Sequence, residues 1–273
     1  MFLTIFANNQ NEEKMKENGH KKPQRAVIMG ASSGIGYALA QRLIAHGWTV
    51  GLAARRTQPL QQLQQQAPER CFYAPIDVTD AHAEAQLLAL FQQMGGVDVY
   101  VHAAGIGWQN PALVAEKELK TAETNAIGFI RMVGTAYRYF AKQHKGHIVC
   151  ISSIAGTKGL GPAPAYSATK ALQNTYLQAL EQLAYQQRLN LRFTDIRPGF
   201  VNTPLLTGTT QFPMLMPVER VAQSIEKAIK RQRHVCIIDW RWRVVTGLWR
   251  LIPNGLWRHV GRMMHRKIWS FKI

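Results

Sequence analysis

The stretch that decides the fold runs from Arg25 to Gly36 and reads RAVIMGASSGIG. Its apolar start, residues 26–29, has strand character, and a helical pattern follows the glycines and ends at His46-Gly47. A strand, a glycine turn and a helix in this order place backbone N–H groups and a helix N-terminus against a pyrophosphate. The alternative is a plain glycine-rich turn. The candidate cofactor-binding residues of the turn are Gly30, Ser32, Ser33, Gly34, Ile35 and Gly36.

The same alternation of strand and helix continues along the chain to residue 238. Apolar runs predict strands at 25–29, 48–53, 71–76, 97–102, 147–152, 189–196 and 234–238, and the helical patterns between them include long stretches at 117–143 and 165–188. This order predicts an α/β fold: a doubly wound, Rossmann-type sheet of seven mostly parallel strands with helices on both faces. We expect a disordered leader (1–24), one dinucleotide-binding and catalytic domain (25–239) and a basic amphipathic tail (240–273).

Two arginines indicate which dinucleotide the glycine turn takes. A cofactor with a free ribose 2′-hydroxyl favours an acidic residue about 20 residues after the glycines, yet no acid occurs between Gly30 and Glu69. Arg55 and Arg56 stand in that place instead, and a guanidinium binds a phosphate bidentately. The pair favours NADP(H) over NAD(H). The alternative is that both arginines are solvated at the start of a helix.

A second cluster consists of Ser153, Tyr166 and Lys170. Tyr166 and Lys170 are four residues apart in a predicted helix and therefore share one face, and Ser153 precedes a turn rich in glycine and proline. An ammonium about 4 Å from a phenol contributes roughly 4 kcal/mol at an effective dielectric of about 20, which lowers the pKa of the tyrosine from about 10 to roughly 7. Such a tyrosine exchanges protons with a carbonyl or an alcohol near neutral pH. The alternative is a solvated Tyr/Lys pair.

Further candidates stand where predicted strands end, which is the edge at which open parallel sheets bind ligands. Small residues there permit close approach of a cofactor. These cofactor-binding candidates are Asp77, Val78, Ala103, Ala104, Gly105, Pro198, Gly199, Val201 and Thr203. His102 is interpreted as a packed strand residue. Asn125 lies inside an apolar helical turn, where it needs hydrogen-bond partners and could bend the helix and hold a water.

The segment from residue 204 to residue 216 is apolar, loop-like and rich in methionine. It suits a mobile lid over an apolar substrate, because methionine adapts to irregular surfaces and loops carry binding functions. The alternative is a flap whose Met and Phe side chains pack on the core.

Composition limits the classes of partner. The 273 residues carry a formal net charge of +17, which raises affinity for a phosphate cofactor, nucleic acid, an acidic carrier protein or anionic lipid. Cys71, Cys150 and Cys236 are widely spaced without a ligand pattern, so we expect buried, reduced cysteines and neither a disulfide framework nor a metal site. The N-terminal residues lack the basic region and cleavage pattern of a signal peptide. The longest uncharged run, residues 198–218, contains four prolines, so we expect no membrane span there.

The tail from Trp240 to Ile273 differs from the rest of the chain. It contains five of the seven tryptophans and eight Lys or Arg residues, with no acid. Trp, Leu and Ile interleaved with Arg at helical spacing predict a basic amphipathic segment, broken at Pro253-Asn254-Gly255. Three interpretations stand: the tail lies on an anionic membrane surface, packs against a second subunit, or binds nucleic acid. Nucleic acid is the least favoured, because no reading module of the usual kinds is present.

Taken together, these motifs resemble the short-chain dehydrogenase/reductase superfamily, in its single-domain, NADP(H)-preferring branch. The resemblance covers residues 25–238 nearly end to end. After the glycine turn, the matching residues follow the family's order: Asp77, Ala104-Gly105, Asn125, Ser153, Tyr166, Lys170 and Pro198-Gly199. Two positions depart from the family pattern. Met29 stands where the family usually has Thr, and His102-Ala103 replaces the usual Asn-Asn pair, both at positions that mainly brace the central sheet in the family.

The resemblance implies a role for each site residue. Tyr166 would be the acid/base, Lys170 would lower its pKa and bind the nicotinamide ribose, and Ser153 would hold the substrate oxygen. Asn125 would anchor a water of a proton relay, and residues 196–203 would flank the nicotinamide, with Thr203 near its carboxamide. The family also commonly pairs subunits through its two long helices, so a homo-oligomer, either dimer or tetramer, is expected.

The expected function is therefore an NADPH-dependent oxidoreductase that reduces a ketone or aldehyde, or oxidises an alcohol in reverse. Its catalytic residues would be Asn125, Ser153, Tyr166 and Lys170, and its substrate a small, apolar carbonyl compound. The alternatives are a non-catalytic NADP(H)-binding sensor or scaffold, and a membrane-surface protein that acts through its basic tail. We expect a cytoplasmic location, with peripheral membrane attachment as its variant.

Overall fold

The computed structural model describes residues 24–206 and 212–268, so all but the last residue of the predicted leader lies outside the described residues. Seven strands form one sheet in the order β3-β2-β1-β4-β5-β6-β7, and every neighbouring pair is parallel. This confirms the predicted doubly wound sheet. The strands are β1 Arg25–Met29, β2 Thr49–Ala54, β3 Cys71–Pro75, β4 Val99–His102, β5 Lys145–Ile151, β6 Asn190–Arg197 and β7 Val235–Ile237.

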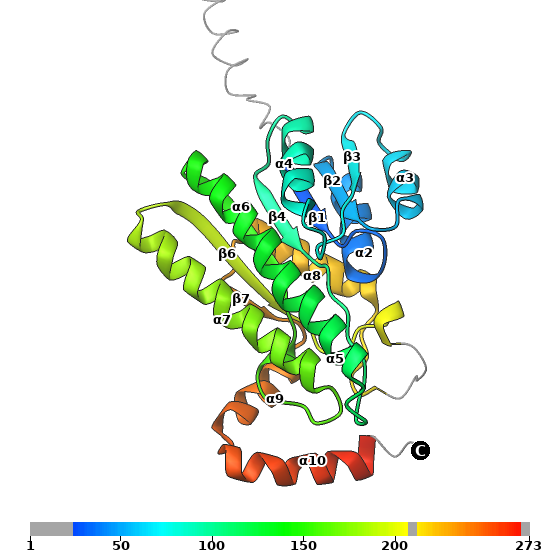
Figure 1. Ribbon diagram of the computed structural model, residues 1–273, viewed down its shortest axis with the longest axis vertical. Helices are drawn as coiled ribbons and strands as arrows, with labels where there is room; N and C mark the ends of the chain where they lie inside the picture. Colours follow the sequence, from blue (N-terminus) through cyan, green and yellow to red (C-terminus); the bar gives the residue numbers. More distant parts are fainter. Residues whose placement is uncertain (1–23, 207–211, 269–273) are drawn as a thin grey trace, which may run out of the picture.

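Helices cover both faces of the sheet. On the near face in Figure 1 lie α4, α6 and α7, while α2 and α8 lie behind the sheet and contact each other. The helices of the described residues are α2 Gly34–Ala45, α3 Gln58–Gln64, α4 Ala83–Gln93, α5 Ala115–Ala122, α6 Phe129–Gln143, α7 Pro164–Gln186, α8 Val218–Lys230, α9 Trp240–Leu251 and α10 Asn254–Ile268.

Strand β1 explains why the central strands read as unbroken apolar runs. Ala26 and Ile28 belong to the buried cluster that packs on α2 and α8, whereas Val27 and Met29 belong to the cluster under α4, α6 and α7. Successive side chains of a strand point to opposite faces. Because both faces are buried here, no polar alternation is possible.

The glycine turn lies at the topological switch point, where β1 and β4 are neighbours although β2 and β3 separate them in the chain. Gly30 has φ +95°, and a Cβ at this position would lie 2.5 Å from the backbone nitrogen of Ala104. Only glycine permits both the positive φ and this close approach. The turns after β1 and β4 therefore pack directly against each other, at the carboxyl edge where such sheets bind ligands.

One predicted element is wrong in detail. The stretch 117–143 is not a continuous α-helix, because a π-helical turn at Glu123–Gly128 separates α5 from α6. Asn125 lies in this turn and is fully buried, with its amide bonded to the backbone of Ile106. A π-turn inserts one residue into the helical ladder and often marks a functional site. The expected bend at Asn125 thus takes the form of a wider helical turn.

The tail forms two helices, α9 and α10, that separate at the predicted break beside Pro253. They lie at the end of the domain where α7 begins (Figure 1). Trp242 is 3% exposed and belongs to the same buried cluster as α2 and α8, so α9 is packed onto the domain. Within the described parts of the chain, no helix is both long and apolar enough to cross a bilayer. The three cysteines are free and buried, as expected.

Two histidines are buried in the middle of the sheet. His102 on β4 has its Nδ1 3.0 Å from the hydroxyl of Tyr100, and His147 on β5 has its Nε2 2.8 Å from the hydroxyl of Thr194. Burial, with Lys170 nearby, lowers the pKa of His102 from 6.5 to about 3. Burial, with Arg192 nearby, lowers the pKa of His147 to about 4. Both imidazoles are therefore neutral in the folded protein, and His102 is a packed strand residue as predicted.

These two pKa values predict that acid destabilises the fold. Below pH 6.5 these two histidines become protonated in the unfolded chain but stay neutral in the folded protein. The free energy of unfolding therefore falls as pH drops toward 3. Each histidine contributes at most about 1.4 kcal/mol per pH unit. Urea denaturation at about pH 7 and about pH 5 measures the slope. We expect H102Q to flatten it, and the exposed-site control H82Q to keep it; an unchanged slope in H102Q would contradict the assignment.

Candidate active site

Tyr166 lies in the first turn of α7, and Lys170 lies one turn further on the same face. The Nζ of Lys170 is 5.7 Å from the centroid of the Tyr166 ring. Lys170 is 5% exposed, whereas Tyr166 is partly accessible. The structure therefore brings the two predicted residues together, with the ammonium beneath the phenol.

Backbone and side-chain acceptors hold the buried ammonium. The Nζ of Lys170 donates to the carbonyl of Ile151 at 3.0 Å and to Oε1 of Gln173 at 2.9 Å. A Cβ at Gly105 would lie 3.6 Å from the same Nζ, so the turn after β4 closes over the lysine. Burial lowers the pKa of Lys170 from its ordinary value, against the opposing effects of Cys150 and Asp195.

Ser153 follows β5 and lies beside the phenol. Its Oγ accepts a hydrogen bond from the N–H of Ala155 at 3.1 Å, which fixes the start of a short 3₁₀ turn. Its side chain is also hydrogen-bonded to Tyr166. Ser153 and Tyr166 are separated by a loop in the chain, and the ends of β5 and α7 bring them together.

The expected pKa of Tyr166 is wrong. Burial raises the pKa of Tyr166 above its ordinary value of 10, and the hydrogen bond from Ser153 opposes this only in part. The prediction of roughly 7 assumed an ammonium beside the hydroxyl, whereas Lys170 lies under the ring and is itself desolvated. Burial disfavours the charged form of both groups. Tyr166 is therefore protonated at neutral pH.

Asn125 joins this centre through its backbone and its amide. Its Oδ1 accepts from the N–H of Ile106 at 2.8 Å, its Nδ2 donates to the carbonyl of Ile106 at 2.6 Å, and its own carbonyl accepts from Nε2 of Gln173 at 2.8 Å. Gln173 therefore links Asn125 to Lys170 directly. The resemblance implies that Asn125 holds a water. In this structure the backbone carbonyl of Asn125 accepts a hydrogen bond from the side chain of Gln173.

Sequence reasoning missed Gln173, although its position offered a signal. It stands three residues after Lys170 and thus on the same helix face, and it is fully buried. Gly107 was also missed as a packing position. A Cβ there would lie 2.4 Å from Cδ2 of Tyr166, so only glycine leaves room for the ring.

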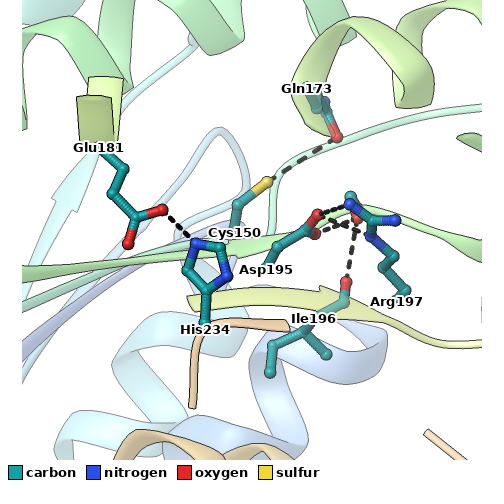
Figure 2. A network of polar contacts seen from close by, with 8 residues as sticks. Cys150, Gln173, Glu181, Asp195, Ile196, Arg197 and His234 are labelled. Carbon is teal, nitrogen blue, oxygen red and sulfur yellow. Dashed lines mark hydrogen bonds and ion pairs between the residues drawn. The ribbon is translucent and has the colours of Figure 1, made fainter. Parts of the chain in front are cut away.

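A buried carboxylate, Asp195 on β6, supports the strand end that carries Ser153. It accepts hydrogen bonds from the hydroxyl of Ser152 and from Nε of Arg197. Figure 2 shows Asp195 between Arg197 and the strand that carries Cys150. The N–H of Ser152 also donates to the carbonyl of Ile196 at 2.9 Å. These bonds fix the backbone just before Ser153.

The two arginines have different partners. The guanidinium of Arg56 is exposed and lies 3.3 Å from Oγ and 3.4 Å from the carbonyl oxygen of Ser32, in the glycine turn. Arg55 instead approaches Asp77 at 3.8 Å. Burial tends to raise the pKa of Asp77, but hydrogen bonds from Thr79 and the charge of Arg55 lower it overall. The structure thus places Arg56, more directly than Arg55, beside the predicted phosphate-binding turn.

The predicted cofactor residues of the glycine turn and of the turns after β4 and β6 lie together. The N–H of Ala103 donates to the carbonyl of Met29 at 2.8 Å, and Ala104 packs on Gly30. The methyl group of Thr203 would be 3.4 Å from a Cβ at Gly34. Gly36 is equally confined, since a Cβ there would lie 2.2 Å from the carbonyl oxygen of Gly30. Ser33 precedes α2 with extended backbone and makes no side-chain cap, and Ile35 is partly buried.

Other candidates face the core. Val78 is buried, and a Cβ at Gly128 would lie 2.6 Å from one of its methyl groups. Val201 is 5% exposed and forms an isolated parallel bridge with Met216. Their side chains therefore pack the fold, and contact of these two residues with a cofactor stays a prediction. Pro198 accepts a hydrogen bond from the N–H of Ile154 at 3.1 Å, which ties the turn after β6 to the turn after β5.

The predicted lid, residues 204–216, is described in two parts, 204–206 and 212–216, because residues 207–211 lie outside the described residues. In the first part, Leu205 of the 3₁₀ turn Pro204–Leu206 is 42% exposed. In the second part, Phe212 stacks on Phe200 at 4.7 Å, and Met216 is 1% exposed. The second part thus packs on the core, as the alternative interpretation expected.

A hollow of about 590 Å³ lies beside this centre rather than in it. Its walls come from the loop 156–161, from Asn254 at the start of α10 and from the residues Ser167, Ala168 and Ala171 of α7. At 3.6 residues per turn, these positions lie on the side of α7 away from Tyr166 and Lys170. The hollow therefore does not open onto the Tyr166 hydroxyl.

Comparisons with known proteins identify the family and the fold. The family model for short chain dehydrogenase matches residues 24–213. An uncharacterized oxidoreductase of Myxococcus xanthus is 33% identical over 252 residues, covering 88% of this chain and 96% of the relative. A solved variant of actinorhodin polyketide ketoreductase with NADPH has a TM-score of 0.69 at 25% identity, covering 79% of this chain and 95% of that one. ElxO with NADP bound shares the fold, with a TM-score of 0.70 at 21% identity over 81% of this chain and 99% of that one.

The bridge through Gln173 predicts a loss of stability on its removal. Q173L takes an acceptor from the Lys170 ammonium and a donor from the Asn125 carbonyl, both buried. We expect the free energy of unfolding to fall by about 1–3 kcal/mol in urea denaturation. The matched control is Q178L, an exposed glutamine of the same helix, which should stay within about 0.5 kcal/mol of the wild type. Equal stability of Q173L and Q178L would contradict a structural bridge.

Proposed function

The chain belongs to the short-chain dehydrogenase family of oxidoreductases, and from that premise we propose that it is an NADPH-dependent carbonyl reductase. The observation that carries the proposal is the buried Lys170 held beneath Tyr166, with Ser153 bonded to the same phenol. A packed core needs no such group. Burying an ammonium costs several kcal/mol unless acceptors surround it, so a merely structural position would favour an apolar side chain.

Tyr166 would act as the general acid. Its raised pKa keeps the phenol protonated at neutral pH, which is the form that can donate to a carbonyl oxygen. Ser153 would hold that oxygen within reach of the phenol. After the transfer, the hydrogen bond from Ser153 and the nearby charge of Lys170 would stabilise the phenolate. Carbonyl reduction requires this protonated phenol, whereas alcohol oxidation requires the phenolate, which the raised pKa makes scarce at neutral pH.

NADPH, when bound, supplies the hydride that the carbonyl carbon accepts. The glycine turn fits its pyrophosphate, because its backbone is bare and leads into the N-terminus of α2. Arg56 beside Ser32 fits a 2′-phosphate, and the nearby acid, Asp77, is already paired with Arg55 and Thr79. The ketoreductase at 25% identity was solved with NADPH, which supports the same preference here.

The substrate class is proposed from the apolar segment 204–216 that follows the turn after β6. Leu205 in this segment is exposed, and Phe212 stacks on Phe200 of the turn. We expect a small apolar ketone or aldehyde, with Asn125 and Gln173 holding Lys170 in place. A non-catalytic NADP(H) sensor is the alternative, but it would have no need of a proton donor.

Replacing Tyr166 tests the mechanism. Y166F removes the proton donor, so we expect kcat for carbonyl reduction to fall by about 10²–10⁴-fold. The assay follows NADPH absorbance with a panel of apolar ketones and aldehydes. Y185F changes an exposed tyrosine of the same helix and should keep full activity. The wild-type reduction rate should stay level through neutral pH and decline only above the ordinary tyrosine pKa of 10, whereas alcohol oxidation should rise with pH.

Full reductase activity in Y166F would overturn the mechanism. Absence of turnover by the wild type with every carbonyl of the panel, together with tight NADPH binding, would favour the sensor instead.

The different partners of the two arginines predict unequal effects on cofactor use. R56A should raise the KM for NADPH by about tenfold to a hundredfold, because a charge-assisted hydrogen bond contributes about 1.5–3 kcal/mol. R55A should have a smaller effect, since that side chain already approaches Asp77. Neither change should alter the KM for NADH much. Equal increases for NADH and NADPH in R56A would contradict recognition of the 2′-phosphate.

A further inference from the structure

Helix α9 has an inner face that fixes it to the domain. Trp242 and Thr246 are 3% and 2% exposed. The ring of Trp242 lies 5.7 Å from that of Phe200 in the turn after β6, and 6.2 Å from that of Trp249. Trp249 continues the contact to Trp257 of α10 at 5.4 Å. The orientation of α9 is therefore set by buried aromatic packing.

The outer face of α9 is apolar and exposed. Trp240, Val244, Leu248 and Leu251 are 71%, 54%, 58% and 79% exposed. Their spacing of four, four and three residues aligns them in one stripe along the helix, on the side away from Trp242. A contiguous apolar surface of this kind marks an interaction site, whereas single exposed apolar residues do not.

Arginines border this stripe on both sides. Arg241 lies on one side, and Arg243 and Arg250 on the other, and all three are exposed. Arg241 is paired with Asp239, but within the described residues neither Arg243 nor Arg250 forms an ion pair with a carboxylate. The sequence from residue 240 onward contains no acid, and the whole chain has a net charge of +17.

We propose that the outer face of α9 docks this protein on an anionic membrane surface. The apolar stripe would enter the headgroup region, and Arg243 and Arg250 would contact lipid phosphates. A helix with a strong apolar face and flanking arginines is the form that lies in a membrane interface. Anionic lipids attract basic segments by about 1 kcal/mol per residue near the surface. This inference does not depend on the proposed reductase activity.

Charge argues against the other occupants of this face. A second copy that packed its α9 on this one by two-fold symmetry would bring unpaired arginines of both chains together, with no acid in either tail. Nucleic acid would neutralise the arginines but would leave Val244, Leu248 and Leu251 facing a phosphate backbone. An anionic bilayer would remove the apolar stripe from water and would also pair its phosphates with the bordering arginines.

Docking would also orient the proposed site. A Cβ at Gly199 would lie 2.1 Å from Nε1 of Trp242, so the inner face of α9 touches the turn after β6. In addition, Nζ of Lys158 donates to the carbonyl of Ile252 at the end of α9, at 3.0 Å. The loops after β5 and β6 are therefore attached to the helix that meets the lipid.

Vesicle co-sedimentation of the full chain tests the proposal. We expect binding to vesicles of phosphatidylcholine mixed with phosphatidylglycerol, little binding to phosphatidylcholine alone, and release as salt is raised. The double variant W240S/L248S should lose at least about tenfold in affinity, because it removes two of the four apolar side chains that would enter the headgroup region. R243Q/R250Q should lose about fivefold per arginine and show a weaker salt dependence.

The matched control is L88S/Y185S, which removes two exposed apolar side chains from α4 and α7, at 43% and 85% exposure. It should bind vesicles like the wild type, and thermal melts should show that all variants are folded. Wild-type binding to neither vesicle, or equal binding of W240S/L248S and wild type, would overturn the proposal. Sedimentation velocity without lipid gives a third outcome: a wild-type dimer that W240S/L248S converts to monomer would assign the face to a second copy. Preferential binding of a DNA duplex over anionic vesicles would likewise overturn it.

Discussion

The buried ammonium of Lys170 is the constraint on which the rest of the site depends. A charge in this position is stable only if acceptors surround it, and the carbonyl of Ile151 and Oε1 of Gln173 provide them. These bonds join α7 to the end of β5. Gln173 extends the connection to the carbonyl of Asn125, whose amide in turn holds the turn at Ile106. One charge therefore sets the relative positions of a strand end, a helix, a π-turn and a loop.

The same burial sets the proton chemistry. Desolvation raises the pKa of Tyr166 and lowers that of Lys170, because a low dielectric disfavours the charged form of each. A neutral phenol above a sheltered ammonium suits a proton donor whose conjugate base is stabilised after the transfer. Asp195 lies behind this pair and holds Ser152, so the position of Ser153 also depends on a buried carboxylate. The proposed carbonyl reduction requires a protonated Tyr166 beside Lys170 and Ser153, and this is the arrangement that burial produces.

Aromatic packing connects the tail to the same region. A continuous line of ring contacts runs from the apolar segment after β6 to the start of α10, through Phe212, Phe200, Trp242, Trp249 and Trp257. Because this line takes up the inner face of α9, the outer apolar residues cannot reach the core. The inward tryptophans thus stabilise the domain, while the outward stripe and its arginines suit a lipid surface.

The amino-acid sequence by itself determined the parallel sheet, the glycine turn after its first strand and the shared helix face of Tyr166 and Lys170. These depend on local spacing: apolar runs form strands, and residues four apart in a helix are neighbours. Only the tertiary structure decided the partners of Arg55 and Arg56, the π-turn at Asn125, the bridge through Gln173 and the direction of the Tyr166 pKa shift. It also decided which tail tryptophans face inward. Each of these depends on contacts and burial between residues far apart in the chain, which no local pattern records.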